Sequence, residues 1–177
     1  MAANPNWARW IFHSVADCLK EVATDADLPV LVEHFDERTT AFERAGDKAE
    51  IRITGPFDQE LSKGYHRIYV DVNVLLTSRY DGASKNAATI LKNAGLFHEA
   101  MSEPIPVWNF GDEPGDYVED DPPDHLYPET HVFLGCLIPR PGRNESVRVM
   151  NFGQLDKVDK IKQTEVDARY VMELTEQ

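Results

Sequence analysis

The side chains whose types and spacing could do chemistry lie in one proline-containing stretch. His125 and His131 stand near Asp120, Asp121 and Asp124, and imidazole nitrogens with carboxylate oxygens are ligands that zinc and iron accept. The spacing matches no known site for these metals, and it lacks the glycine turn and terminal glutamate of a calcium-binding EF-hand. The stretch therefore predicts a solvated loop, with a small metal-dependent hydrolase at the His125 and His131 region as the less favoured alternative.

Other kinds of reactive site have no candidate residues. No serine stands in a Gly-x-Ser-x-Gly elbow, and Cys18 and Cys136 both fall in patterns that would bury them. The ten glycines are scattered singly among turns, so neither a phosphate-binding loop nor a dinucleotide fingerprint is present. We expect no catalytic residues, no cofactor and no enzymatic activity. Two cysteines also make no disulfide framework, which favours a reducing compartment.

Charge is the chain's most unusual property. Its 18 Lys and Arg residues against 31 Asp and Glu residues give a formal net charge of −13, which repels nucleic acid and anionic membranes at long range. The stretch 111–130 has eight acidic residues and no basic one, and it predicts a long acidic loop. Arg140 and Arg143, at an expected hairpin tip, are the one concentrated basic site, and they could face such a loop on a neighbouring copy in a closed ring. The expected interface or lumen residues are Asp112, Glu113, Asp116, Glu119, Asp120, Asp121, Asp124, Arg140 and Arg143.

The elements that must position these residues show two clear periodicities. Apolar and mostly polar residues alternate over 66–77 and again over 165–175, as in antiparallel strands with one buried and one wet face. Apolar residues recur at three- and four-residue steps over 7–23 and 83–101, which predicts two amphipathic helices. Weaker patterns predict strands at 28–35 and 50–54, a turn-rich connector at 55–64, and a hairpin of 130–138 with 146–152.

These elements predict a single α+β domain over residues 1–177. Its fold class is a mainly antiparallel β-sheet with two α-helices packed on one face, plus a β-hairpin and the acidic loop 111–130. No window reaches the roughly 20 apolar residues that span a bilayer, and no basic region precedes an apolar run near the N-terminus. We therefore expect neither membrane insertion nor secretion.

In its order of elements and its length, the chain resembles the tail terminator or tail completion proteins of long-tailed bacteriophages. The resemblance is carried by the long strand 67–77, the helix 83–101 behind it and the closing strand 165–175. The family has no catalytic signature, so no site residue is carried over from it. The loop 111–130 is longer than the family pattern needs.

The resemblance implies a homo-oligomeric ring, usually hexameric, that caps the tail tube, stops tube polymerisation and docks to the head-tail connector. DNA would pass through the lumen without specific binding, because a negative wall repels phosphates. The protein would then be part of the virion neck, assembled in the host cytoplasm. Two alternatives remain: another neck or tail protein, such as a head-completion, adaptor or tail-tube subunit, and an acidic module that recruits a basic partner through 111–130.

Overall fold

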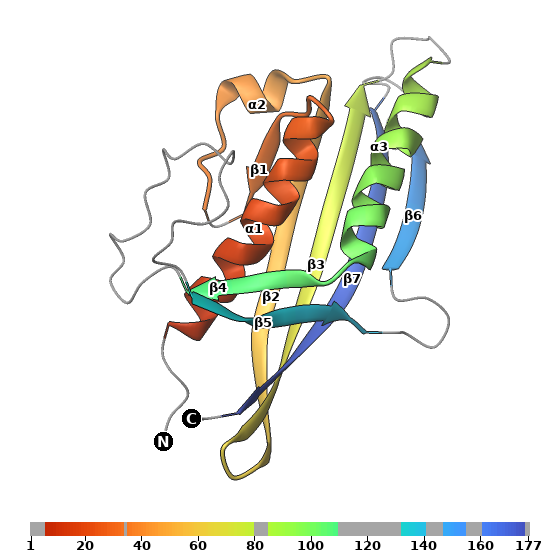
Figure 1. Ribbon diagram of the computed structural model, residues 1–177. Coiled ribbons are helices and arrows are strands. Elements are labelled where there is room, and N and C mark those ends of the chain that lie inside the picture. Colours follow the sequence, from red (N-terminus) through yellow and green to blue (C-terminus); the bar gives the residue numbers. More distant parts are fainter. Residues whose placement is uncertain are drawn as a thin grey trace.

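The structure, a computed structural model, describes residues 6–33, 35–79, 85–109, 132–140, 147–154 and 161–175. Within these ranges three helices and seven strands form an α+β fold, as the sequence predicted (Figure 1). The strands make one curled, mainly antiparallel sheet in the order β1-β2-β3-β7-β5-β4, and β6 also pairs with β7. The elements are α1 (Trp7–Asp25), β1 (Val30–Val32), α2 (Thr40–Arg44), β2 (Asp47–Ser62), β3 (Tyr65–Arg79), α3 (Lys85–Ser102), β4 (Ile105–Asn109), β5 (Val132–Pro139), β6 (Val147–Gln154) and β7 (Ile161–Thr175).

The centre of the sheet is the pairing of β3 with β7. The two strands run antiparallel in an unbroken register, from Tyr65 opposite Thr175 to Arg79 opposite Ile161. Because side chains alternate between the two faces of a strand, the even-numbered residues of both strands lie on the face that carries the core. The buried members other than Ser78 and Thr164 are Ile68, Val70, Val72, Val74, Leu76, Val166, Ala168, Tyr170 and Met172. The predicted alternation is thus confirmed in both strands.

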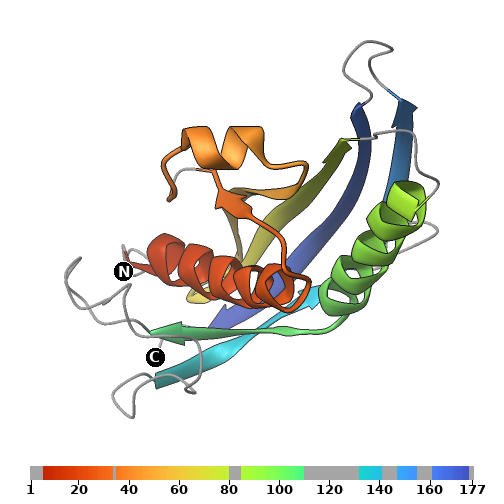
Figure 2. The ribbon, with the colours of Figure 1, turned by 90° about the horizontal axis from the view of Figure 1, so that it is seen from above.

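Two helices cover this inner face of the sheet. α1 packs against β2 and β4, and α3 packs against β3, β6 and β7. The apolar sides of both helices, among them Leu19 of α1 and Phe97 of α3, are fully buried in the same core. Figure 2 shows how the sheet curls around α1 so that β4 and β5 close one end of the core. At that end the backbone N–H of Trp108 donates a hydrogen bond of 3.1 Å to the buried hydroxyl of Ser14.

A third helix, absent from the sequence prediction, lies on the other side of the sheet. α2 has only five residues and begins at Thr39, whose hydroxyl accepts a hydrogen bond from the N–H of Phe42. Figure 2 shows α2 and α1 on opposite sides of β1. A single helical turn has too few residues to show a period of 3.6, which is why the polar stretch 36–48 predicted no helix.

The segment predicted as a turn-rich connector, residues 55–64, is mostly strand. β2 continues through it to Ser62 and turns into β3 through a two-residue loop, with Gly64 at a φ of 75°. Gly55 and Pro56, the first residues of the predicted connector, form a β-bulge that the strand passes through. As a result the β2–β3 hairpin reaches past β4 and β5 at the lower end of Figure 1. We call its residues 55–70 the arm.

The predicted hairpin of 130–138 with 146–152 is wrong. β5 pairs with β4 and with residues Tyr170 and Val171 of β7, whereas β6 pairs with β7 further along, between Lys162 and Ala168. The two strands therefore lie one after the other along the same edge of β7. Local sequence cannot distinguish the two pairings, because the competing partner lies elsewhere in the chain.

One buried hydrogen bond joins the end of α3 to the centre of the sheet. The hydroxyl of Tyr170, in a fully buried side chain of β7, donates to the backbone carbonyl of Met101 at 2.7 Å. The last carbonyls of a helix have no partner within the helix, so this hydroxyl replaces one that the helix cannot supply. Burial raises the pKa of Tyr170, and the hydroxyl remains a donor over the whole physiological range.

Replacing this hydroxyl tests the connection. Tyr170→Phe leaves the Met101 carbonyl buried without its partner, and we expect the free energy of unfolding to fall by about 1–3 kcal/mol, measured by urea denaturation. The control is Tyr69→Phe, which removes an exposed hydroxyl that donates to Gln59 at 3.2 Å. Equal losses in the two variants would contradict a special role for Tyr170.

His13 makes the stability of the fold depend on pH. Burial, followed by the positive charges of Arg9 and Lys20, lowers the pKa of His13 to about 4. Its ring lies 4.8 Å from that of Phe35, measured between centroids. In the unfolded chain His13 is therefore protonated as the pH falls through about 6.5, whereas in the folded protein it is protonated only near pH 4.

The expected result is a stability that is retained above about pH 6.5 and decreases as the pH falls toward 4. The free energy of unfolding, measured by denaturation at several pH values between 7 and 5, should decrease less steeply in His13→Gln than in the unchanged protein. Identical slopes in the two proteins would rule out His13 as the source.

Candidate assembly surface

The face of the sheet opposite α1 and α3 carries polar side chains in ordered rows. We call it the outer face. On β3 and β7 it consists of the odd-numbered residues, whose register partners on neighbouring strands lie directly beside them. Each row crosses the sheet perpendicular to the strands, so the chemistry of the surface can be followed row by row.

Toward the arm's tip, one row holds Arg67 and Glu173 opposite each other. The guanidinium of Arg67 donates to one carboxylate oxygen of Glu173 at 2.5 Å, and the hydroxyl of Tyr65 donates to the other. These two donors, Tyr65 first and then Arg67, lower the pKa of Glu173. The carboxylate is therefore held in its ionised form.

Two further ion pairs continue this pattern toward the other end of the sheet. Arg169 of β7 donates through two nitrogens to both oxygens of Asp71 of β3, at 2.5 and 2.7 Å. Arg148 of β6 donates to Asp167 of β7 at 2.7 Å. Opposite charges placed directly across strands stabilise their pairing, so these contacts fix the register on the wet side of the sheet.

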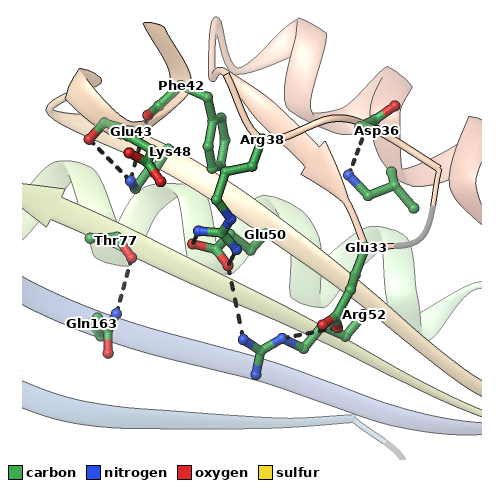
Figure 3. Close-up of polar contacts among 11 residues, drawn as sticks. Glu33, Asp36, Arg38, Phe42, Glu43, Lys48, Glu50, Arg52, Thr77 and Gln163 are labelled. Carbon is green, nitrogen blue, oxygen red and sulfur yellow. Dashed lines mark hydrogen bonds and ion pairs between the residues drawn. The ribbon is translucent and has the colours of Figure 1, made fainter. Parts of the chain in front are cut away.

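At the β1 and β2 end the ion pairs join into a chain of four residues, shown in Figure 3. Glu50, whose side chain is only 11% exposed, accepts a hydrogen bond of 2.9 Å from Arg38. Arg52 lies 3.9 Å from Glu50 on one side and 3.3 Å from Glu33 on the other. Charges of opposite sign alternate along the chain, so the nearly buried carboxylate of Glu50 faces two guanidinium groups.

α2 covers this end of the outer face. Its buried residue Phe42 lies beneath the ammonium group of Lys48, which is 4.9 Å from the ring centroid. The buried Leu31 of β1 stands opposite Glu50 and therefore on the same face. Neither Leu31 nor Phe42 belongs to the main core cluster. Two buried apolar side chains, Leu31 and Phe42, thus lie outside the main core at this end of the sheet.

One row of the outer face is apolar. Phe57, Tyr69, Val171 and Ile138 stand directly opposite one another on β2, β3, β7 and β5. The two residues at its ends are large and exposed, Phe57 by 51% and Ile138 by 54%. We call these four residues the apolar row. It lies between the ion pair Arg67–Glu173 and the ion pair Asp71–Arg169.

The β-bulge in β2 is what brings Phe57 to this row. Thr54 stands opposite Asp71 and Phe57 opposite Tyr69, so β2 uses one residue more than β3 between these points. The extra residue exchanges the two faces as far as Glu60, where a second irregularity follows, and between these points odd-numbered residues replace even-numbered ones on the outer face. Gly55 has a φ of 117° there, and a Cβ at this position would lie 2.9 Å from the carbonyl oxygen of Tyr69. The bulge therefore requires glycine.

Of the predicted interface residues, the structure describes only Arg140. Its guanidinium lies over the ring of Tyr69, 5.3 Å from the centroid, and its backbone N–H donates to the backbone carbonyl of Arg169 at 2.7 Å. Arg140 thus belongs to the edge of the apolar row, an environment that the sequence did not predict. The remaining members lie outside the described residues: Asp112, Glu113, Asp116, Glu119, Asp120, Asp121, Asp124 and Arg143.

The metal alternative falls on residues that the structure does not describe, since His125 and His131 lie outside them. Within the described ranges no group of three or more His, Cys, Asp or Glu side chains is placed to hold a metal ion. In the same ranges no helix has both the length and the apolar composition of a bilayer span.

The outer face has the features of a contact surface. Five of its carboxylates form ion pairs with arginine side chains. These carboxylates are Glu33, Glu50, Asp71, Asp167 and Glu173. An apolar row bordered by paired ions has the composition of a protein–protein interface, with an apolar centre and a polar rim.

Sequence reasoning missed most of this surface. Phe57 lay in the supposed connector, and Ile138 in a strand with the wrong partner. The signal that could have found the arm is Lys63-Gly64, a two-residue loop with glycine second, directly before the long strand beginning at Tyr65. Nothing local to Ile138 indicates its neighbours.

The ion chain allows a test of the surface's stability. Glu50→Gln keeps the side chain's shape but leaves two guanidinium groups facing a neutral amide, so we expect the free energy of unfolding to fall by about 1–3 kcal/mol. Glu33→Gln, at the exposed end of the chain, is the matched control and should leave stability nearly unchanged. Thermal or urea denaturation of both variants decides, and equal effects would contradict the central place of Glu50.

Two sequence comparisons were made, and neither identifies a relative of this chain. The sequence was compared with protein-family models and with curated proteins, and neither comparison found a match.

Proposed function

We propose that this protein is a non-enzymatic structural subunit of a bacteriophage virion, and that it acts as a tail terminator at the head-to-tail junction. Copies of the chain form a ring, hexameric in the resembled family, which caps the tail tube, stops its polymerisation and docks to the head-tail connector. The protein's partners are other copies of itself, the tail tube protein and a connector or adaptor protein.

The observation that carries the proposal is the outer face with its arm. A sheet with helices on one side, an ion-paired surface on the other and a hairpin reaching beyond the body offers contact area on several sides, as a ring subunit requires. The exposed Phe57 and Ile138 lie where another protein could cover them. The saturated ion pairs support a structural role, because they leave the outer carboxylates of the described residues engaged.

The charge of the chain fits a channel that DNA passes through. At −13 per subunit, a ring accumulates a negative potential that repels phosphates, so a genome can slide without binding. The same charge favours a neck station over a DNA-packaging role, because a protein that wraps DNA needs a basic surface.

Solution mass and tail morphology test the proposal. The purified protein should have a mass several times that of the 20.1 kDa chain, about sixfold for a hexamer, and should bind the ends of preformed tail tubes. A phage that lacks the protein should produce tails of uncontrolled length, seen by electron microscopy. Tails of normal length that fail to join heads would indicate an adaptor instead, and a strict monomer that binds neither tube nor connector would contradict the proposal.

A further inference from the structure

We infer that the apolar row, Phe57, Tyr69, Val171 and Ile138, is the surface through which one copy of this chain docks onto the next. The inference deepens the proposed function and rests on it for its setting in a ring. The structure carries it through four features: an exposed apolar centre, a rim of paired ions, a local charge that differs from that of the whole chain, and an arm built to present the row.

The centre of the row has the size and chemistry of an interface anchor. Four side chains from four neighbouring strands stand in direct register, and the exposed ends Phe57 and Ile138 are both large. Aromatic side chains on a fixed backbone lose little conformational entropy when they are covered, and they dominate the energy of many interfaces. Strand pairing on both sides holds Tyr69 and Val171 in place before any partner arrives.

The border of the row is polar and already ordered. Arg67–Glu173 lies on one side and Asp71–Arg169 on the other, and Arg140 rests on the ring of Tyr69. Paired polar groups that border an apolar centre exclude water from that centre when a partner binds. A rim of this extent fits a protein surface and exceeds what a small ligand would cover.

Lipid and nucleic acid are poor occupants of this surface. A membrane would have to bury the ion pairs that lie beside the row on both sides, and removing paired charges from water is costly. Nucleic acid needs unpaired basic side chains for its phosphates, whereas Arg67 and Arg169 beside the row are paired with carboxylates. A protein partner can instead leave the ion pairs at the wet rim.

Charge identifies a second copy as the partner. In the outer-face rows from Gln59 to Lys48, the basic and acidic side chains are nearly balanced, although the chain as a whole is strongly acidic. A second copy, itself acidic, meets less like-charge repulsion on this part of its neighbour than the charge of the whole chain would cause. The basic members are Lys48, Arg52, Arg67, Arg140, Arg148 and Arg169, and the acidic ones are Glu33, Glu50, Asp71, Glu165, Asp167 and Glu173.

The arm presents the row and gains from being covered. The bulge at Gly55 turns Phe57 outward, whereas a regular strand would have placed Pro56 opposite Tyr69. Beyond the bulge, the arm extends past the strands that close the core (Figure 1). A ribbon of few strands is only marginally stable alone in water and usually packs against another element. The neighbouring copy supplies that element.

Two substitutions on the row and one elsewhere test the inference. Phe57→Thr with Ile138→Thr removes both exposed apolar side chains and places threonine, a β-branched residue suited to strands, at both positions. The matched control is Leu91→Gln on α3, which removes an apolar side chain of 52% exposure from the opposite side of the sheet. Association is measured by sedimentation over a range of concentrations, and folding by circular dichroism and thermal denaturation.

We expect the unchanged protein and the Leu91→Gln variant to assemble equally well. Each row substitution should raise the dissociation constant about 30-fold, so that the double variant is a folded monomer at concentrations where the other two are assembled. If all three proteins assemble alike, the row is not the interface, while the proposed ring function stands. If the unchanged protein is a monomer that also fails to bind tail tubes, both the inference and the proposed function are overturned.

A photo-crosslinking experiment covers the case in which the double variant does not fold. Benzoylphenylalanine placed at position 57 keeps an aromatic side chain on the row, and illumination should join two copies of the chain, with the crosslink located by mass spectrometry. The same probe at position 91 should give no such product. Absence of a crosslink at position 57 in the assembled protein, or capture of a different protein there, would overturn the inference.

Discussion

The unbroken antiparallel pairing of β3 with β7 is the constraint on which the rest of this structure depends. One register, from Tyr65 opposite Thr175 to Arg79 opposite Ile161, decides which side chains face the helices and which face outward. A slip of one residue would exchange the two faces of either strand. A slip of β3 would place Val70 among the ion pairs and Asp71 in the core. A slip of β7 would do the same to Tyr170 and Arg169. The apolar inner side and the salt-bridged outer side therefore reinforce the same alignment.

The outer face shows how a sheet can stay wet without becoming uniformly charged. Arginines and carboxylates occupy opposite positions on neighbouring strands, so that their opposite charges offset each other locally. Against this background the apolar row stands out, because nothing in the described part of the chain covers Phe57 or Ile138 fully. A single extra residue in β2 adds Phe57 to this row, where regular pairing would have placed Pro56.

The parts of the fold that sequence could predict are those in which a long run of residues obeys one period. The alternation around Val70 and Tyr170 and the helical pattern around Leu19 fall in this group. Prediction failed where the decisive partner is distant or the element is short: β6 pairs with β7 rather than β5, and α2 is a single turn. It also failed where a turn signal, Gly55-Pro56, occurs inside a strand. At the candidate surface, Arg140 was identified from its local composition, but its partners Tyr69 and Arg169 lie on β3 and β7 and share no pattern with it in the sequence.

The same central pairing has a consequence for how the chain reaches its folded state. Hydrogen bonds between side chains of β3 and β7 join residues separated by 86 to 108 positions, and contacts between such distant segments form slowly compared with local ones. During synthesis β3 emerges well before β7, with one edge of a valine-rich strand still open. Such an edge can pair with another chain. The order of synthesis thus leaves this edge exposed to pairing with other polypeptides until β7 has been made.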